Sequence, residues 1–238
     1  MSHPITVLWS IPRSVSTSFE RMVSERGDHT VLDEPFSRAY YFGPDRLSDR
    51  YSETIPHSAL HEVVEEIDDA ARQRPVFVKD MAYQAQALLD EAFVGRLRHS
   101  FMVRHPAATL RSLARTWPDF TDDETGWEHL GLVADLVEAQ GDELVVVEAE
   151  SLCSDPGPVV ADWCERMGLD HRPDALTWEP GMRPEWELWA EWHGSTSRTT
   201  GFAPLRPTPP PPGEDQPRLR AAYDAAVPVY ERLRAHAL

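Results

Sequence analysis

Short apolar runs alternate with stretches of helical spacing along most of this chain. The apolar runs, which we predict to be buried strands, span residues 5–9, 30–33, 76–79, 100–104 and 144–148. In the segments between them, apolar residues recur on one face of a helix, and we predict helices over residues 16–26, 58–72, 83–93, 106–115 and 127–140. This alternation predicts an α/β fold, in which a mainly parallel sheet carries helices on both faces.

The pattern weakens after residue 148. Residues 156–167 have helical spacing, and Gly168 is a typical helix stop. The segment 178–192 contains Trp178, Trp186, Trp189 and Trp192, a density that fits a flat or sugar-like ligand and fits a helix-packing core equally well. Residues 207–212 are a stiff proline-rich linker before an amphipathic helix predicted over 219–236. We therefore expect an α/β domain over 1–206, a linker over 207–215 and a C-terminal helix over 216–238 that packs on the same domain.

Composition and charge restrict the classes of partner. The 238 residues, 41% of them hydrophobic, suit one globular domain, and no apolar stretch approaches the roughly 20 residues that span a bilayer. Without a signal-peptide core, and with Cys153 and Cys164 as the only cysteines, we expect a cytoplasmic protein with reduced thiols. A net charge of −17 argues against nucleic-acid and anionic-membrane partners, so an anionic ligand would need locally concentrated cations. The oligomeric state stays open.

The segment after the first predicted strand gathers hydroxyl groups around one cation. Residues 11–18 read Ile-Pro-Arg-Ser-Val-Ser-Thr-Ser, and helical spacing begins near Ser16. A strand that passes into a helix start brings free backbone N–H groups and a positive dipole end together, which favours a phosphate or sulfate. An ordinary helix cap would explain one or two of the hydroxyls, but not the whole set with Arg13. The nucleotide-loop pattern Gly-x-x-x-x-Gly-Lys-Ser/Thr is absent.

Charged residues follow four of the predicted strands. Arg13 follows the first, Glu34 the second, Lys79 and Asp80 end the third, and Arg104 ends the fourth. Ligands of parallel sheets bind beyond the carboxyl ends of the strands, where we expect these groups to converge. A solvated sheet edge would also be polar, so the convergence alone does not define a site.

Lysine occurs once, at position 79, among 23 basic residues. The lysine ammonium is a compact point charge on a flexible stem, whereas arginine carries a planar fork. A position that has kept lysine in an arginine-rich chain therefore indicates a need for a small cation. Chance can also leave one lysine anywhere.

Two of the strand-to-helix junctions resemble motifs of sulfotransferases that use 3′-phosphoadenosine 5′-phosphosulfate (PAPS). Residues 12–17, Pro-Arg-Ser-Val-Ser-Thr, resemble the 5′-phosphosulfate loop, with Val15 where many members have glycine. Residues 101–106, Phe-Met-Val-Arg-His-Pro, followed by Ser112, resemble the 3′-phosphate motif. Residues 31–36, Lys79 and residues 199–202 extend the likeness, over about 5–202, to a bacterial branch with small-molecule acceptors.

This resemblance implies a P-loop NTPase-like sulfotransferase architecture and a role for each matching residue. The 5′-phosphosulfate would be held by Arg13, Ser14, Val15, Ser16, Thr17 and Ser18. Arg104 and Ser112 would hold the 3′-phosphate, and Thr200 and Gly201 would also bind the cofactor. His105 is expected to belong to the cofactor motif rather than to the chemistry.

The catalytic roles follow from charge. Lys79 would face the bridging oxygen that leaves with the phosphate, and Arg13 would assist at the sulfuryl group. Glu34 is the candidate general base, with Asp80 and Asp33 as alternatives. As a residue before a proline at a strand end, Glu34 could instead cap a helix or pair with an arginine. No metal-ligand spacing is present, and no metal is expected.

We therefore predict an enzyme that moves the sulfuryl group of PAPS, in line, to a hydroxyl of a small-molecule acceptor in secondary metabolism. The product would be 3′,5′-adenosine bisphosphate. One alternative is a P-loop-like kinase, for which residues 145–148 would supply a magnesium-binding acid. Another is an inactive nucleotide-binding protein. The sequence does not select the acceptor.

Overall fold

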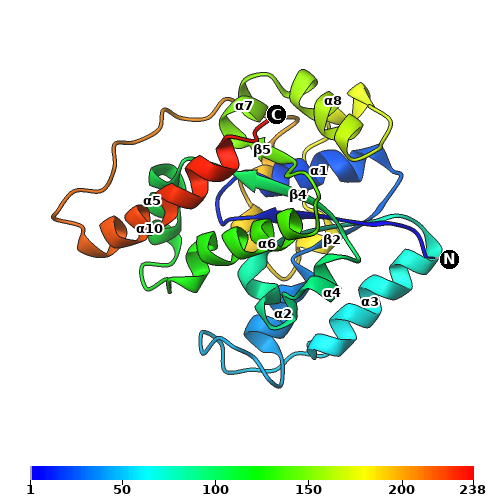
Figure 1. The fold of residues 1–238 in the computed structure, drawn as a ribbon, viewed down its shortest axis with the longest axis horizontal. Helices are drawn as coiled ribbons and strands as arrows, with labels where there is room; N and C mark the ends of the chain where they lie inside the picture. Colours follow the sequence, from blue (N-terminus) through cyan, green and yellow to red (C-terminus); the bar gives the residue numbers. More distant parts are fainter. Residues whose placement is uncertain (1) are drawn as a thin grey trace.

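The computed structural model describes residues 2–238, and within them five parallel strands form a single sheet (Figure 1). The strand order is β2-β3-β1-β4-β5, and every neighbouring pair is parallel. The strands are β1 (Ile5–Ser10), β2 (Thr30–Asp33), β3 (Val76–Met81), β4 (Arg98–Val103) and β5 (Val146–Glu148). The predicted α/β architecture is confirmed.

Alternation along the strands divides the core into two layers. On β1, Val7 and Trp9 pack on one face of the sheet with α2, α3, α6 and α10, whereas Leu8 packs on the other face with α1 and α8. Residues of β3 and β4 alternate in the same way. Because both faces are covered, the strands read as continuous apolar runs in the sequence. The helices are α1 (Ser16–Arg26), α2 (Pro35–Phe42), α3 (Leu60–Gln73), α4 (Glu91–Val94), α5 (Pro106–Thr116), α6 (Trp127–Ala139), α7 (Ala149–Ser154), α8 (Pro156–Arg166), α9 (Ala190–His193) and α10 (Pro217–Arg234).

The helix predicted over residues 83–93 does not form as one element. A 3₁₀ segment over Ala82–Leu88 is followed by the single turn α4. The carboxylate of Asp90 accepts the backbone N–H of Phe93 at 2.8 Å, so it begins a new helix and interrupts the old one. The helix α2 was not predicted, although Pro35 at its first turn is a typical start.

The last helix returns to the sheet after a long excursion. The proline-rich segment loops outward at the left of Figure 1, and α10 then lies against α5 and α6 and reaches β4 and β5. The backbone N–H of Leu238 donates to the carbonyl of Val146 at 3.0 Å, which ties the chain end to β5. No helix among residues 2–238 has the length and apolarity that crossing a membrane requires.

Candidate active site

A cavity of about 320 Å³ opens beyond the carboxyl ends of the central strands. Its walls come from the loop between β1 and α1, the ends of β2 and β3, the turn after β4, helix α5 and the segment 189–205. Of the sequence-predicted residues, Arg13, Ser14, Val15, Ser16, Thr17, Ser18, Glu34, Arg104, Ser112 and Gly201 line it. Lys79, Asp80 and Thr200 do not.

The loop between β1 and α1 has a left-handed backbone at two residues that are not glycine. Arg13 has φ 67° and Val15 has φ 77°. This region is strained for a β-branched residue, and such strain concentrates at ligand sites. The carbonyl of Val15 accepts the N–H groups of Ser18 and Phe19, so the loop leads directly into α1. Val15 thus holds the conformation that a glycine would adopt.

Replacing Val15 with glycine should raise the free energy of unfolding by about 1 kcal/mol. The change relieves about 1–3 kcal/mol of left-handed strain and costs about 0.5–1 kcal/mol in backbone entropy. Equilibrium urea unfolding measures the difference. Ser24→Gly, at a right-handed position in α1, serves as the control and should destabilise the protein. A less stable V15G protein would contradict the assignment of strain.

Two arginines lie together at one end of the cavity. The Arg13 Nε donates to Ser112 Oγ at 3.0 Å, and Arg104 Nη1 donates to the carbonyl of Arg13 at 3.0 Å. Burial, followed by the charge of Arg104, lowers the pKa of Arg13, and burial lowers the pKa of Arg104. The Nε of Arg104 is buried and has no hydrogen-bond partner among the described residues. We call this region, with the loop of residues 13–18, the donor half; its two guanidinium groups concentrate positive charge there.

Several residues predicted to bind the cofactor instead bond to nearby backbone groups or line another hollow. The hydroxyl of Ser14 donates to the carbonyl of Ile11 at 2.8 Å and so stabilises the loop itself. His105 accepts the N–H of Ala107 through Nδ1 and caps α5. Thr200 borders an adjoining hollow together with Gly201 and Phe202. Ser14 and His105 therefore stabilise local backbone structure, and Thr200 lies beside the cavity rather than at its wall.

Lys79 is completely buried beneath the cavity rather than at its wall. Its Nζ lies 2.5 Å from Asp33 Oδ1, 2.6 Å from Glu34 Oε1 and 3.7 Å from Glu20 Oε2. Burial alone would lower the pKa of Lys79, but the carboxylates outweigh it and raise the pKa, so the ammonium persists. The cation thus faces three carboxyl groups instead of the cavity, so its expected contact with a leaving oxygen stays a prediction. A compact ammonium suits a fully buried position of this kind better than a planar guanidinium.

Glu34 connects this buried cluster to the cavity. It is the residue before α2, with φ 44°, and its side chain makes no cap hydrogen bond. Its Oε1 accepts from Lys79, and its Oε2 accepts from Gln84 Nε2 at 3.3 Å. Glu34 is mostly buried and lines the cavity. It is therefore a carboxylate held from both sides at the edge of the space.

The alternative bases have fixed structural partners. Asp80 accepts the N–H groups of Phe36 at 2.9 Å and of Met81 at 2.7 Å, and it does not line the cavity. Burial, then the charge of Glu34, raises the pKa of Asp80 well above its usual range. For Asp33, burial would raise the pKa, but Lys79 and a hydrogen bond with His193 outweigh it and lower the pKa. Neither carboxylate is placed to meet an acceptor.

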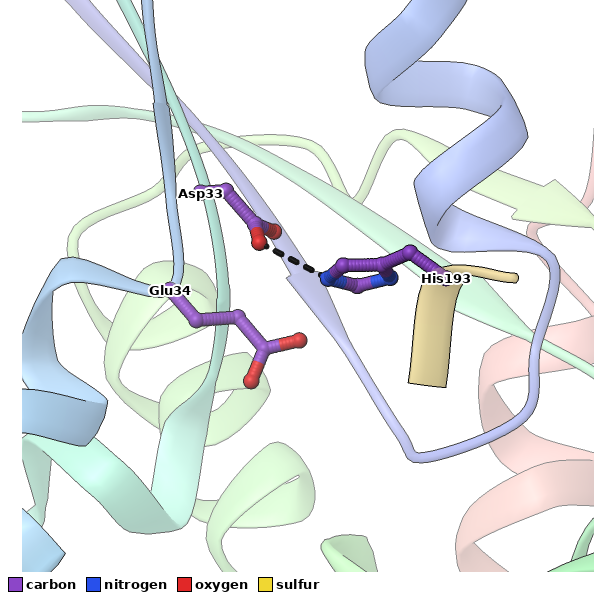
Figure 2. Close-up of side chains that lie close together, drawn as sticks. All are labelled: Asp33, Glu34 and His193. Carbon is purple, nitrogen blue, oxygen red and sulfur yellow. Dashed lines mark hydrogen bonds and ion pairs between the residues drawn. The ribbon is translucent and has the colours of Figure 1, made fainter. Parts of the chain in front are cut away.

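Figure 2 shows His193 facing Asp33, with Glu34 beside them. The Nε2 of His193 lies 2.9 Å from Asp33 Oδ2, and its Nδ1 lies 3.3 Å from Thr17 Oγ1. The two ring nitrogens of His193 are thus each within hydrogen-bond distance of one partner. His193 lines the cavity, and sequence reasoning missed it. Its only signal was its position next to Trp192, inside the tryptophan-rich segment.

Asp33, Glu34 and His193 bring three ligand atoms within 4.8 Å of one another, the spacing of a metal site. The Lys79 ammonium already pairs with both carboxylates, and His193 is engaged on both ring nitrogens. A divalent cation would have to displace that lysine.

A chain of hydrogen bonds runs behind Glu34. The amide of Gln84 donates both to Glu34 and to the Tyr83 hydroxyl, at 3.3 Å each. The hydroxyls of Tyr83 and Tyr41 are 2.9 Å apart, and Tyr41 donates to Glu124 at 3.2 Å. Since the single proton of Tyr41 goes to Glu124, Tyr83 donates to Tyr41. Gln84 gave no sequence signal beyond its place just after β3.

Glu148, the acid that a kinase would use for magnesium, points elsewhere. Its Oε1 accepts from Tyr230 and from Arg234, each at 2.8 Å, and its Oε2 accepts from Ser151 at 3.0 Å. It therefore helps to attach α10 to the sheet. The geometry gives the kinase alternative no support.

Known proteins resemble this chain over almost its entire length. The family model described as "Sulfotransferase domain" matches residues 5–237, past the expected end of the likeness at residue 202. The branched-chain-amino-acid aminotransferase-like protein 2 of Arabidopsis thaliana is 27% identical over 235 residues, which cover 96% of this chain and 41% of that protein. This chain thus spans about two fifths of the length of the curated relatives it matches.

Two solved structures share the fold at low identity. The sulfotransferase domain from the olefin synthase of Synechococcus PCC 7002 has a TM-score of 0.62 at 16% identity and covers 100% of this chain and 97% of its own. The sulfotransferase domain from the curacin biosynthetic pathway has a TM-score of 0.50 at 13% identity, covering 99% and 97%.

Proposed function

This chain belongs to the family of sulfotransferase domains, and on that premise we propose that it transfers the sulfuryl group of PAPS to a hydroxyl of a small-molecule acceptor. The arrangement that carries the proposal is the donor half next to Glu34 in one cavity. A cationic, hydroxyl-rich helix start and a carboxylate held by Lys79 line the same cavity.

The donor half fits the two anionic groups of PAPS. The positive end of α1 and the N–H groups of the strained loop suit the 5′-phosphosulfate, with Arg13 beside them. The partnerless Nε of Arg104 indicates a missing anion at the second position, and there Arg104 with Ser112 would hold the 3′-phosphate. When bound, PAPS supplies the activated sulfuryl group.

Glu34 would act as the general base. It would accept the proton of the acceptor hydroxyl as the new oxygen–sulfur bond forms and the bond to the phosphate oxygen breaks, releasing 3′,5′-adenosine bisphosphate. Lys79 would then serve as a positioning residue that holds Glu34, instead of a contact to the leaving oxygen. The Asp33–His193 pair is the second candidate for the base, since its imidazole also faces the cavity.

The acidic surface supports small molecules as partners. At a net charge of −17, we propose that nucleic acids and anionic membranes are not partners of this chain. A cytoplasmic location and a role in secondary metabolism are parts of the same proposal.

Calorimetric titration with 3′,5′-adenosine bisphosphate tests the donor site. The parent protein should bind it and should not bind ATP comparably. Arg104→Ala should weaken binding by about 10- to 150-fold, because a charged contact to a buried phosphate contributes about 1.5–3 kcal/mol. Adenosine 5′-phosphosulfate, which lacks the 3′-phosphate, should bind the parent more weakly, and R104A should remove most of that gap.

Arg111→Ala is the matched control, because Arg111 lies on the same helix as Ser112 but donates to the carbonyl of Pro210 outside the cavity. If R104A binds the bisphosphate as well as the parent does, the 3′-phosphate lies elsewhere. Radiolabelled PAPS then tests the transfer itself.

A further inference from the structure

One part of the cavity wall is aromatic. We define this acceptor half by Tyr41, Met81, Tyr83, Trp117 and Trp189, all of which line the cavity. Trp192 borders both halves, because the Arg13 guanidinium lies 5.6 Å above the centre of its ring. Tyr41 lies edge to face against Trp117 and Trp189, and Trp117 lies edge to face against Trp192 at 4.6 Å. Aromatic walls of this kind favour a flat apolar ligand.

Among the described residues, the five that define the acceptor half include no cation, and Arg13 contacts Trp192 from the donor half. Arg50 stacks on Trp117 at 4.1 Å, but its guanidinium is paired with Glu124 and Asp119. Lys79 is enclosed by carboxylates. A carboxylate or phosphate on a ligand would therefore lose its water without gaining a partner, which is costly.

Most hydrogen-bond donors of the acceptor half are already engaged. The hydroxyl protons of Tyr41 and Tyr83 go to Glu124 and to Tyr41, and both amide protons of Gln84 go to Glu34 and Tyr83. The indole N–H of Trp189 donates to Ser37 at 2.8 Å. The indole N–H of Trp192 is buried and has no partner among the described residues. A ligand with many hydroxyls would leave most of them unsatisfied.

We infer that the acceptor is an uncharged aromatic hydroxyl compound, with its ring against the tryptophans and its hydroxyl at Glu34. This inference rests on the proposed function for the fate of the hydroxyl, and on the cavity alone for the class of ligand. It excludes acceptors that carry a carboxylate or phosphate on the ring, and it excludes free sugars.

Three probes separate these classes by calorimetry on protein saturated with 3′,5′-adenosine bisphosphate: 2-naphthol, 6-hydroxy-2-naphthoate and methyl glucoside. The naphthol should bind at least about 10-fold more tightly than the naphthoate, which has the same rings and an added charge, corresponding to about 1.4 kcal/mol. The glucoside should give no binding heat. Equal or tighter binding of the naphthoate or the glucoside would overturn the inference, as would a lack of naphthol binding up to its solubility limit.

A variant that adds a cation tests whether the lack of positive charge sets the preference for uncharged ligands. A gain in naphthoate binding cannot be explained by loss of folding. Met81→Arg places a cation in the acceptor half and should narrow or reverse the preference for naphthol over naphthoate. Met182→Arg adds the same charge at an exposed methionine outside the cavity and should leave the preference unchanged. If M81R leaves the preference as large as in the parent, the missing cation does not determine the acceptor class.

Two further measurements test the class of ligand separately from the proposed sulfuryl transfer. They are the same titrations without nucleotide and the release of radiolabelled product from PAPS. Preference for naphthol without nucleotide binding or transfer would leave the ligand class standing and refute the proposed function. Transfer without a preference for naphthol would support the proposed function and refute the inferred class of acceptor.

Discussion

Replacing Lys79 with methionine should lower the free energy of unfolding by about 3–5 kcal/mol, as measured by urea denaturation. The change leaves Asp33 and Glu34 buried without their cation, and removing one partner of a buried ion pair has costs of this size. The pKa of Glu20 is raised well above its usual range by burial and then by Asp33, so this third carboxyl adds little further negative charge. Lys79→Arg should also destabilise the protein, because the site is closed and fully buried.

The double variant Lys79→Met with Asp33→Asn supplies the control. It removes one of the stranded charges and should recover part of the lost stability, whereas additive losses would show that the charges do not interact. If the free energy of unfolding of K79M lies within about 1 kcal/mol of that of the parent, Lys79 does not stabilise Asp33 and Glu34 as described above.

The same lysine variant should lower sulfuryl transfer far more than nucleotide affinity. Lys79 does not line the cavity, but it holds one oxygen of Glu34. Single-turnover transfer and binding of 3′,5′-adenosine bisphosphate would be measured side by side, in buffer where the variant is folded. Equal proportional losses in the two would mean that Lys79 supports the donor half rather than the base.

Glu34→Gln should reduce transfer to an unactivated alcohol such as benzyl alcohol by about 10²- to 10⁴-fold, the usual effect of removing a positioned base. Nucleotide binding should survive, because Arg13 and Arg104 are untouched. Transfer to 4-nitrophenol, which is already partly ionised near neutral pH, should fall much less. Rates with the two acceptors on the same protein preparation give the comparison.

Glu124→Gln is the matched control for this change. It neutralises another buried carboxylate, one that supports Tyr41 and Arg50 without lining the cavity, so both acceptors should be affected alike. If E34Q keeps most of its activity on benzyl alcohol, Glu34 has a structural role. The Asp33–His193 pair then becomes the next candidate, because Asp80 is occupied by backbone N–H groups.

The sequence predicted the sheet well because its inner strands are largely buried and apolar, with helices on both faces, whereas the edge strand β2 is half-buried. The donor half could be predicted for a related reason. Arg13 and Arg104 follow strands in the sequence, and parallel topology brings such positions together. The helix expected over 83–93 failed at Asp90, where a local side-chain cap overrode the helical spacing.

The acceptor side could not be predicted in the same way. His193 and Gln84 reach the site through contacts with Asp33 and Glu34 that lie 160 and 50 positions away in the chain. No local spacing encodes such pairs. The roles of the acids also depended on burial. Glu34 reaches the cavity, whereas Asp80, in the neighbouring strand β3, turns inward and accepts the backbone N–H of Phe36.

Because the single lysine is buried, the folded protein offers no lysine side chain to amine-directed reagents. Acylating reagents and amine-directed cross-linkers find no exposed lysine side chain anywhere in the sequence, because its one ammonium group lies inside the protein. A lysine-specific endoproteinase likewise has one cleavage point, after residue 79 within β3, which becomes available only when the sheet opens. The rate of cleavage into two fragments of unequal length therefore reports how often the central strands open. No lysine at the surface adds further cleavage.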